Sequence, residues 1–192
     1  MTKTFLSSVV LSVGIFYSTL CSAVVPTQAM TFATNVTTYG TTSAQEAKIQ
    51  AAEAHIRAVI GSDEFRNAVL NYTYNGKKAF YDNGGLSNAQ IYQKILDGAE
   101  TLQPSKNNAM DIGVKIYTEN STTVGFTTTG STMINMNTKF FNSYTSVGVS
   151  NNMMHEWLHK LGFVHAVNYS PSRDHSVPYA IGTIMGQLAL KY

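Results

Sequence analysis

The sequence predicts an α+β domain, because helix-like and strand-like patterns occupy separate blocks of the chain. Residues 43–60 carry apolar side chains at helical spacing and are followed by a glycine stop. Residues 111–119 alternate between apolar and polar side chains, which is typical of a half-buried strand. Another amphipathic helix is expected near the C-terminal end, at about residues 151–161. We therefore expect a sheet and several helices around one core.

Three helices are expected before the strands. The first begins at a capping box, Ser43-Ala44-Gln45-Glu46, and buries Ala52, Ile56, Val59 and Ile60. Ser62 and Ser87 are expected to cap the next two, over residues 63–70 and 88–99. Between those two helices, residues 71–81 alternate around Asn75-Gly76, which predicts a β-hairpin with a type I′ turn.

The sheet is expected to draw on four segments. Residues 24–42 are polar and rich in threonine, and we interpret them as an arm or a first strand. The alternating segment 111–119 is the clearest strand. Two shorter strands, 122–128 and 131–137, are expected on either side of Gly130.

The helix near residues 151–161 has one apolar stripe, formed by Met154, Trp157, Leu158 and Leu161 at i, i+3, i+4 and i+7. This stripe is expected to lie in the core, Trp157 included. Ser150 is the expected N-cap. The histidines of the helix fall on its flank, where they can face a cleft.

Those histidines belong to a motif that runs from His155 to His165 and has the form H-E-x-x-H-x-x-G-x-x-H. His155 and His159 are four residues apart on a helix, so both side chains can bind one metal ion. Gly162 can adopt positive φ and reverse the chain, which lets His165 arrive as a third ligand. Three imidazoles leave the fourth tetrahedral position open, as in catalytic zinc sites. The sequence therefore predicts one catalytic Zn2+.

Glu156 is the carboxylate built into this motif. Its place beside the first ligand suits a general base that takes a proton from zinc-bound water as the water attacks a carbonyl. Glu156 is therefore the predicted catalytic residue.

The segment from His155 to His165 resembles the zinc signature of the metzincin metalloendopeptidases. Met185, in Gly182-Thr183-Ile184-Met185-Gly186, resembles the methionine of the family's turn below the metal. The resemblance implies a two-subdomain zinc protease with a twisted mixed sheet. Backing and active-site helices would lie above the cleft (residues 24–162), and a small subdomain would lie below it (residues 163–192). Met185 would form an apolar floor, an edge strand would pair with extended substrate, and the chain would be a small secreted bacterial member.

The chain also departs from the family pattern. Gln187 stands where some members carry a tyrosine that binds zinc. Tyr179 lies in the same segment and could approach the site instead. His175, in a loop with proline and serines, is expected to be solvated rather than catalytic. His55, alone on the first helix, is expected to be a surface or packed residue.

The first 23 residues have the pattern of a signal peptide. Lys3 precedes an apolar stretch at residues 5–20, and Cys21-Ser22-Ala23 supplies small residues for cleavage before Val24, with cleavage after Ala29 as the alternative. The apolar stretch is too short and too often interrupted by serine for a membrane span. Residues 24–192 are thus expected to form one catalytic domain without cysteine, secreted or periplasmic, with no stable membrane association.

The charge balance sets limits on partners. The chain has 13 basic and 11 acidic residues without a basic stripe, which gives no support to nucleic-acid binding. A monomer that cleaves protein or peptide substrates is the leading hypothesis. The alternatives are an exported zinc hydrolase of a non-protein amide, and a binding protein stabilised by zinc. Glu156 and the open metal position argue against the last of these.

Overall fold

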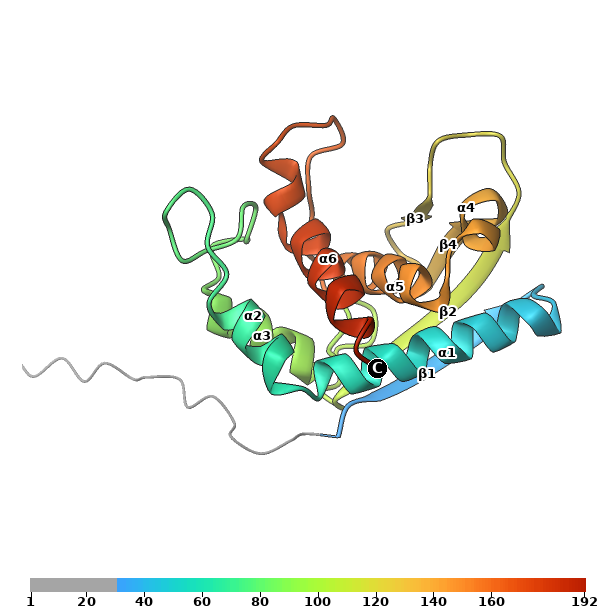
Figure 1. Ribbon diagram of the computed structural model, residues 1–192, viewed down its shortest axis with the longest axis horizontal. Helices are drawn as coiled ribbons and strands as arrows, with labels where there is room; N and C mark the ends of the chain where they lie inside the picture. The colour runs from blue at the N-terminus through green and yellow to red at the C-terminus, as the bar shows by residue number, and fades with distance from the viewer. Residues whose placement is uncertain (1–30) are drawn as a thin grey trace, which may run out of the picture.

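The structure, a computed structural model, describes residues 31–192 and confirms the α+β class (Figure 1). Within this range it contains one mixed four-stranded sheet and six α-helices. The predicted signal peptide and both cleavage sites lie outside the described residues. None of the helices in residues 31–192 is long and apolar enough to cross a membrane. The elements, in chain order, are β1 (Ala33–Tyr39), α1 (Ser43–Ile60), α2 (Asp63–Leu70), α3 (Asn88–Asp97), β2 (Ala109–Tyr117), β3 (Gly125–Thr127), β4 (Met133–Asn137), α4 (Thr138–Ser143), α5 (Ser146–Lys160), a 3-10 turn (Arg173–His175) and α6 (Val177–Ala189).

The strands lie in the order β1-β2-β4-β3. β1 and β4 pair with β2 in parallel, and Val114 of β2 lies opposite Thr38 on one side and Ile134 on the other. β3 pairs antiparallel with β4, in a register that sets Gly125 opposite Met136. β3 therefore forms one edge of the sheet, in the region where short strands were expected.

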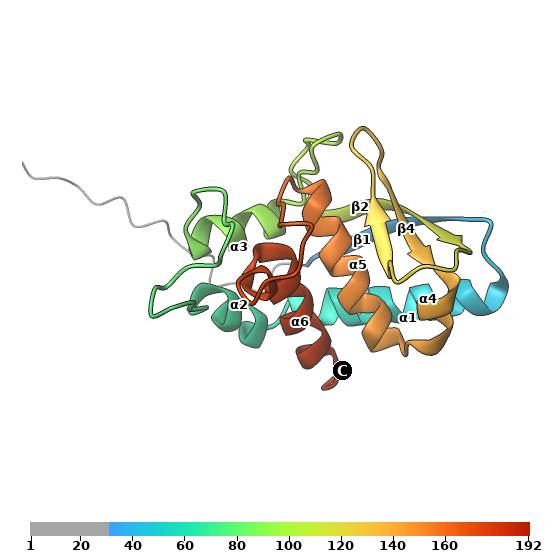
Figure 2. The ribbon, with the colours of Figure 1, turned by 90° about the horizontal axis from the view of Figure 1, so that it is seen from above.

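One face of the sheet is apolar and covered by helices. The side chains of Met110, Ile112, Val114, Ile134 and Met136 are all buried. α1 packs against β1 and α5, and α5 packs against β3 and β4. Figure 2 shows α5 between the sheet and α6, so the helix with the histidines is fixed on both sides.

The predicted starts of α1, α2 and α3 are correct to within a residue, and the caps explain the differences. α1 is capped by Thr42, whose extended backbone directs its side chain to the amide of Gln45. The capping box is thus one residue earlier than the predicted Ser43 and Glu46. Ser62 and Ser87 cap α2 and α3 as predicted. α3 ends two residues early, because Gly98 takes the left-handed conformation (φ 63).

The predicted hairpin at residues 71–81 is wrong beyond its turn. Asn75 and Gly76 both have positive φ, 48 and 72, as a type I′ turn requires. The pairing is limited to an isolated bridge at Tyr74. The segment instead docks on the C-terminal region, where the Tyr81 amide donates a hydrogen bond to the His175 carbonyl at 2.9 Å.

His175 is packed rather than solvated. Its Nδ1 lies 2.7 Å from the Tyr72 hydroxyl, and the Tyr74 ring stacks on the imidazole with centroids 4.4 Å apart. The prediction that His175 is not catalytic stays a prediction; the expectation that its side chain is solvated is wrong, whereas Asp174 beside it is exposed. His175 fixes the 71–81 segment to the start of α6.

Met185 lies inside α6, not in a turn. Val177, Ala180, Ile181 and Met185 are buried along one side of this helix, at helical spacing. Ser176 precedes the helix and Pro178 occupies its first turn, where the missing proline N–H costs nothing. The sequence carries this apolar periodicity as well, and the periodicity explains why a helix replaces the expected turn.

Candidate metal centre

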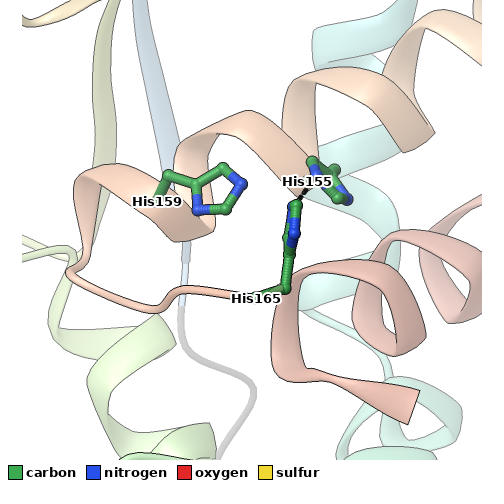
Figure 3. Close-up of side chains that lie close together, drawn as sticks. All are labelled: His155, His159 and His165. Atoms are coloured by element: carbon green, nitrogen blue, oxygen red, sulfur yellow. Dashed lines mark hydrogen bonds between the residues drawn. The ribbon is translucent and has the colours of Figure 1, made fainter. Parts of the chain in front are cut away.

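The structure brings His155, His159 and His165 into one cluster (Figure 3). One nitrogen from each imidazole lies within 4.8 Å of the other two. The Nε2 atoms of His155 and His165 are 3.2 Å apart. Among the His, Cys, Asp and Glu side chains of residues 31–192, these three histidines are the group whose ligand atoms lie close enough together to hold one metal ion.

α5 presents the first two histidines because its opposite side is buried. The predicted stripe of Met154, Trp157, Leu158 and Leu161 is confirmed, since each of these side chains is at most 1% exposed. The Trp157 indole N–H donates to a Glu100 carboxylate oxygen at 2.5 Å, which fixes the rotation of the helix.

The predicted N-cap of this helix is wrong. α5 begins at Ser146, and the Thr145 hydroxyl accepts from the Gly148 amide. Ser150 is fully buried inside the helix, where its hydroxyl donates to the Val147 carbonyl at 2.8 Å. The threonine cap one turn upstream satisfies the free amides and allows the helix to start earlier.

The predicted reversal at Gly162 is confirmed. Gly162 has φ 90, a conformation that side-chain-bearing residues rarely adopt. Its amide donates to the His159 carbonyl at 3.0 Å, and the Phe163 amide donates to the Leu158 carbonyl at 3.1 Å. These bonds close the end of α5 and turn the chain back, which delivers His165 to the first two histidines.

Each imidazole is oriented by a backbone carbonyl. The Nδ1 atom of His159 lies 2.8 Å from the Phe163 carbonyl oxygen, and that of His165 lies 2.9 Å from the Ala166 oxygen. At His155 the backbone of Pro178, which has no N–H to donate, acts as a hydrogen-bond acceptor that raises the pKa against the effect of burial. A ring N–H that donates to a carbonyl leaves the other nitrogen as a lone-pair donor, the usual arrangement of a metal-binding histidine.

Burial favours the neutral form of His155 and His159, the form that binds a metal. Burial, together with the neighbouring His159 and His165, lowers the pKa of His155 to about 3. Burial also lowers the pKa of His159, against a hydrogen bond with Phe163 that raises it.

The carboxylate of Glu156 lies in the same wall of the cleft and is 4% exposed. Burial raises its pKa to about 7, and the charge of Lys160 opposes that rise. Gly125 of β3 passes close by, since a Cβ atom at this position would lie 3.3 Å from Glu156 Oε1. The glycine thus leaves room between the edge strand and the carboxylate.

We expect the substitution Glu156→Gln to stabilise the metal-free protein at pH 8 but not at pH 4. The folded state holds the carboxyl proton up to a pKa of about 7, whereas the ordinary value is 4.5. Glu156 contributes its full share of the free energy of unfolding below pH 4.5. This contribution is lost as the pH rises through 7, which lowers the free energy of unfolding by at most about 3 kcal/mol. Glutamine keeps the shape of the protonated carboxyl without titrating. Thermal melts of both proteins in chelator at the two pH values measure this difference, and equal gaps in melting temperature at pH 4 and pH 8 would contradict it.

A cleft of about 1210 Å³ runs past the cluster. Its walls include the three histidines, Glu156, β3 with the following turn, and residues of the C-terminal region. The histidine cluster is therefore open to a ligand, and the ligand would lie beside the edge strand.

Two further residues shape the site: Tyr179, which the sequence indicated could approach it, and Gly182, for which the sequence predicted no role in it. The Tyr179 ring lies against His155 and His165, with ring centroids at 4.5 and 4.6 Å. Gly182 permits the close approach of α6 to α5 that brings the ring there, because a Cβ at this position would come within 2.9 Å of Asn151 Oδ1 and 3.4 Å of the His155 Cβ. Gly182 and Gly186 are four residues apart on α6, a spacing that could have indicated close helix packing.

His55 lies apart from the metal cluster. It is half-buried on α1, and its Nε2 is 3.1 Å from the Ser146 hydroxyl at the start of α5. It is a packed residue, one of the two roles expected for it.

Comparison of the chain with protein-family models, curated proteins and solved structures finds no match in any of the three, so the geometry of the site carries the functional argument alone.

Proposed function

We propose that the protein is a zinc-dependent endopeptidase with a metzincin-like site, secreted through its N-terminal segment. The observation that carries the proposal is the cluster of His155, His159 and His165 beside the buried carboxylate of Glu156. The cluster opens into a cleft with a sheet edge along one wall. The whole of residues 24–192 would act as one catalytic domain.

The donor set suits zinc. Three neutral imidazoles favour borderline ions such as Zn2+ over Mg2+ or Ca2+, which prefer oxygen ligands. Structural zinc sites are closed by four protein ligands, whereas the cluster in residues 31–192 has three. This difference favours a catalytic ion over the purely structural metal of a binding protein.

The proposed chemistry divides between the ion and the chain. When bound, a zinc ion acidifies water and polarises the carbonyl of the scissile bond. Glu156 accepts a proton from the attacking water and passes it to the leaving amine. Its burial supports this role, because burial raises the pKa of Glu156 in the metal-free chain and so makes the carboxylate a stronger proton acceptor than an exposed one.

The edge strand favours a peptide over a small amide. β3 is three residues long, and its register leaves one side of the strand at the margin of the sheet, facing the cleft. An extended peptide can add to such an edge through backbone hydrogen bonds. A compact non-protein amide would gain nothing from it, so this alternative stays second.

The proposed likeness to metzincins includes a departure. α1 and α5 supply a backing and an active-site helix on one face of the sheet. The C-terminal segment packs on α5 through α6 and would serve as the lower subdomain. Met185 is fully buried there, which supports an apolar structural role, although it belongs to a helix instead of a turn.

The test is cleavage of a reduced, alkylated and therefore unfolded protein by the zinc-loaded chain. Internal cuts that stop with chelator and return with added zinc are expected. Absence of cuts from a chain that binds zinc would overturn the endopeptidase proposal and shift the function to a non-protein amide.

We expect Tyr179→Ala to weaken zinc binding about 10-fold or more, because it removes the ring that packs on two of the three imidazoles. Tyr179→Phe keeps the ring and should retain most of the affinity. Competition with a fluorescent zinc chelator measures both. Equal weakening in the two variants would contradict the packing role and assign the effect to the hydroxyl.

A further inference from the structure

Arg173 is a cation in the same cleft whose charge the rest of the described chain leaves unmatched. It lies in the 3-10 turn before α6 and lines the cleft together with Tyr179. None of the ion pairs formed within residues 31–192 includes it. Its neighbour Asp174 is exposed and lies outside the cleft lining.

The guanidinium is held one aromatic ring away from the metal cluster. Its central carbon lies 4.5 Å from the centroid of the Tyr179 ring, and one terminal nitrogen donates to the Tyr179 hydroxyl. The same ring contacts His155 and His165. Arg173 is thus placed within one aromatic ring of the histidine cluster, and stacking restricts its movement.

The donors of Arg173 are largely unused. A guanidinium has five N–H donors in a planar fork. In Arg173, Nε is buried and has no hydrogen-bond partner among the described residues. One terminal nitrogen donates to Tyr179, and the terminal N–H groups that Tyr179 does not use remain for a carboxylate, which can accept two parallel bonds.

The other charged groups of the cleft lie elsewhere. Glu100 is bound to the Trp157 indole and the Asp111 amide, the Asp111 carboxylate accepts from Asn35 and Asn107, and Lys160 donates to the carbonyls of Thr128 and Ser131. Glu156 lies beside the histidines as the proposed base and is buried. Arg173 is thus the charged group of the cleft on the side of α6, and Asp174, the carboxylate of its own turn, lies outside the lining.

We propose that Arg173 binds a carboxylate of the substrate next to the scissile bond, and so selects substrates with a negative charge there. The inference rests on the proposed function, since it assigns the specificity of the same site. The carboxylate can come from an Asp or Glu side chain within the substrate or from the free C-terminus of a peptide.

Direct binding of small hydroxamates tests the proposal without turnover. The monohydroxamates of succinate, glutarate and adipate each carry a zinc-binding group and a carboxylate at a different reach, and each is compared with its carboxamide counterpart. Calorimetry on the zinc-loaded chain should show a preference for the carboxylate of about 10-fold or more at one chain length at least. Arg173→Gln should abolish this preference, and Arg173→Lys should retain part of it.

Lys115→Gln is the matched control, because Lys115 is an exposed cation on β2 outside the cleft. It should leave the carboxylate preference unchanged. The role of Arg173 would be overturned if Arg173→Gln and the intact chain showed the same carboxylate preference, or if the intact chain showed no preference at any chain length. Binding of both ligand series would still support the metal centre in that case. If no hydroxamate bound at all, the metal centre itself would be wrong, and this inference with it.

Cleavage of a peptide library then separates the two sources of the carboxylate. Mass spectrometry of the products should show Asp or Glu enriched at one position within two residues of the cut if a side chain is bound. Cuts near the C-terminus that disappear when the peptides are amidated would indicate the terminal carboxylate. Either preference should vanish in Arg173→Gln, and cut profiles identical to those of the intact chain would overturn the proposal.

Discussion

Replacing Glu156 with alanine is expected to lower the rate of peptide cleavage by about 10² to 10⁴-fold while zinc stays bound at one ion per chain. Glu156 is buried beside the histidine cluster, but it is not among the three residues whose ligand atoms converge. Its loss therefore removes the group that accepts the proton and leaves the imidazoles in place. The measurement combines the turnover of a peptide substrate with the zinc content of the same sample.

The controls separate chemistry from folding. Glu64→Ala removes an exposed carboxylate from α2 and should change neither turnover nor zinc content. Glu156→Gln keeps the volume of the side chain and should be as inactive as the alanine variant. Full activity of Glu156→Ala with zinc bound would contradict the assignment of Glu156 as the general base.

Replacing His165 with alanine is expected to weaken zinc binding by more than the roughly 10- to 100-fold typical of an outer-shell change, because it removes a direct ligand. His165 is the one histidine of the cluster outside α5, and its nitrogen reaches His155 at 3.2 Å only through the reversal at Gly162. Two imidazoles at i and i+4 would remain on the helix, so some affinity should persist. Zinc affinity measured by competition with a chelator gives the result.

His55→Ala is the matched control for that variant, because His55 is packed against Ser146 and takes no part in the cluster. It should bind zinc like the intact chain. An unchanged affinity in His165→Ala would show that the third histidine is not a ligand.

The local signals in the sequence predict much of this structure. The motif places two imidazoles on one helix face, and the glycine turn delivers the third, because both effects depend only on short-range backbone geometry. The buried stripe of α5 and the cap at Ser62 are also local, and both predictions are confirmed. The resemblance to metzincins, the zinc ion and the activity stay predictions, and the variants above test them.

The errors have long-range causes. The hairpin at residues 71–81 fails because its aromatic side chains pack on His175, about a hundred residues further along the chain. Met185 falls in α6, whose apolar side closes on α5 at Gly182; the apolar periodicity is local, but the partner that buries it lies on another helix. The placement of Tyr179 and Arg173 follows from that same closure, which is why the sequence did not assign their roles.

X-ray absorption of the zinc-loaded chain tests the central claim most directly. Three imidazole nitrogens at about 2.0–2.1 Å and one oxygen donor are predicted around a single ion, with one imidazole lost in His165→Ala. A first shell with fewer than three imidazoles in the intact chain, or a shell unchanged by the substitution, would contradict the account.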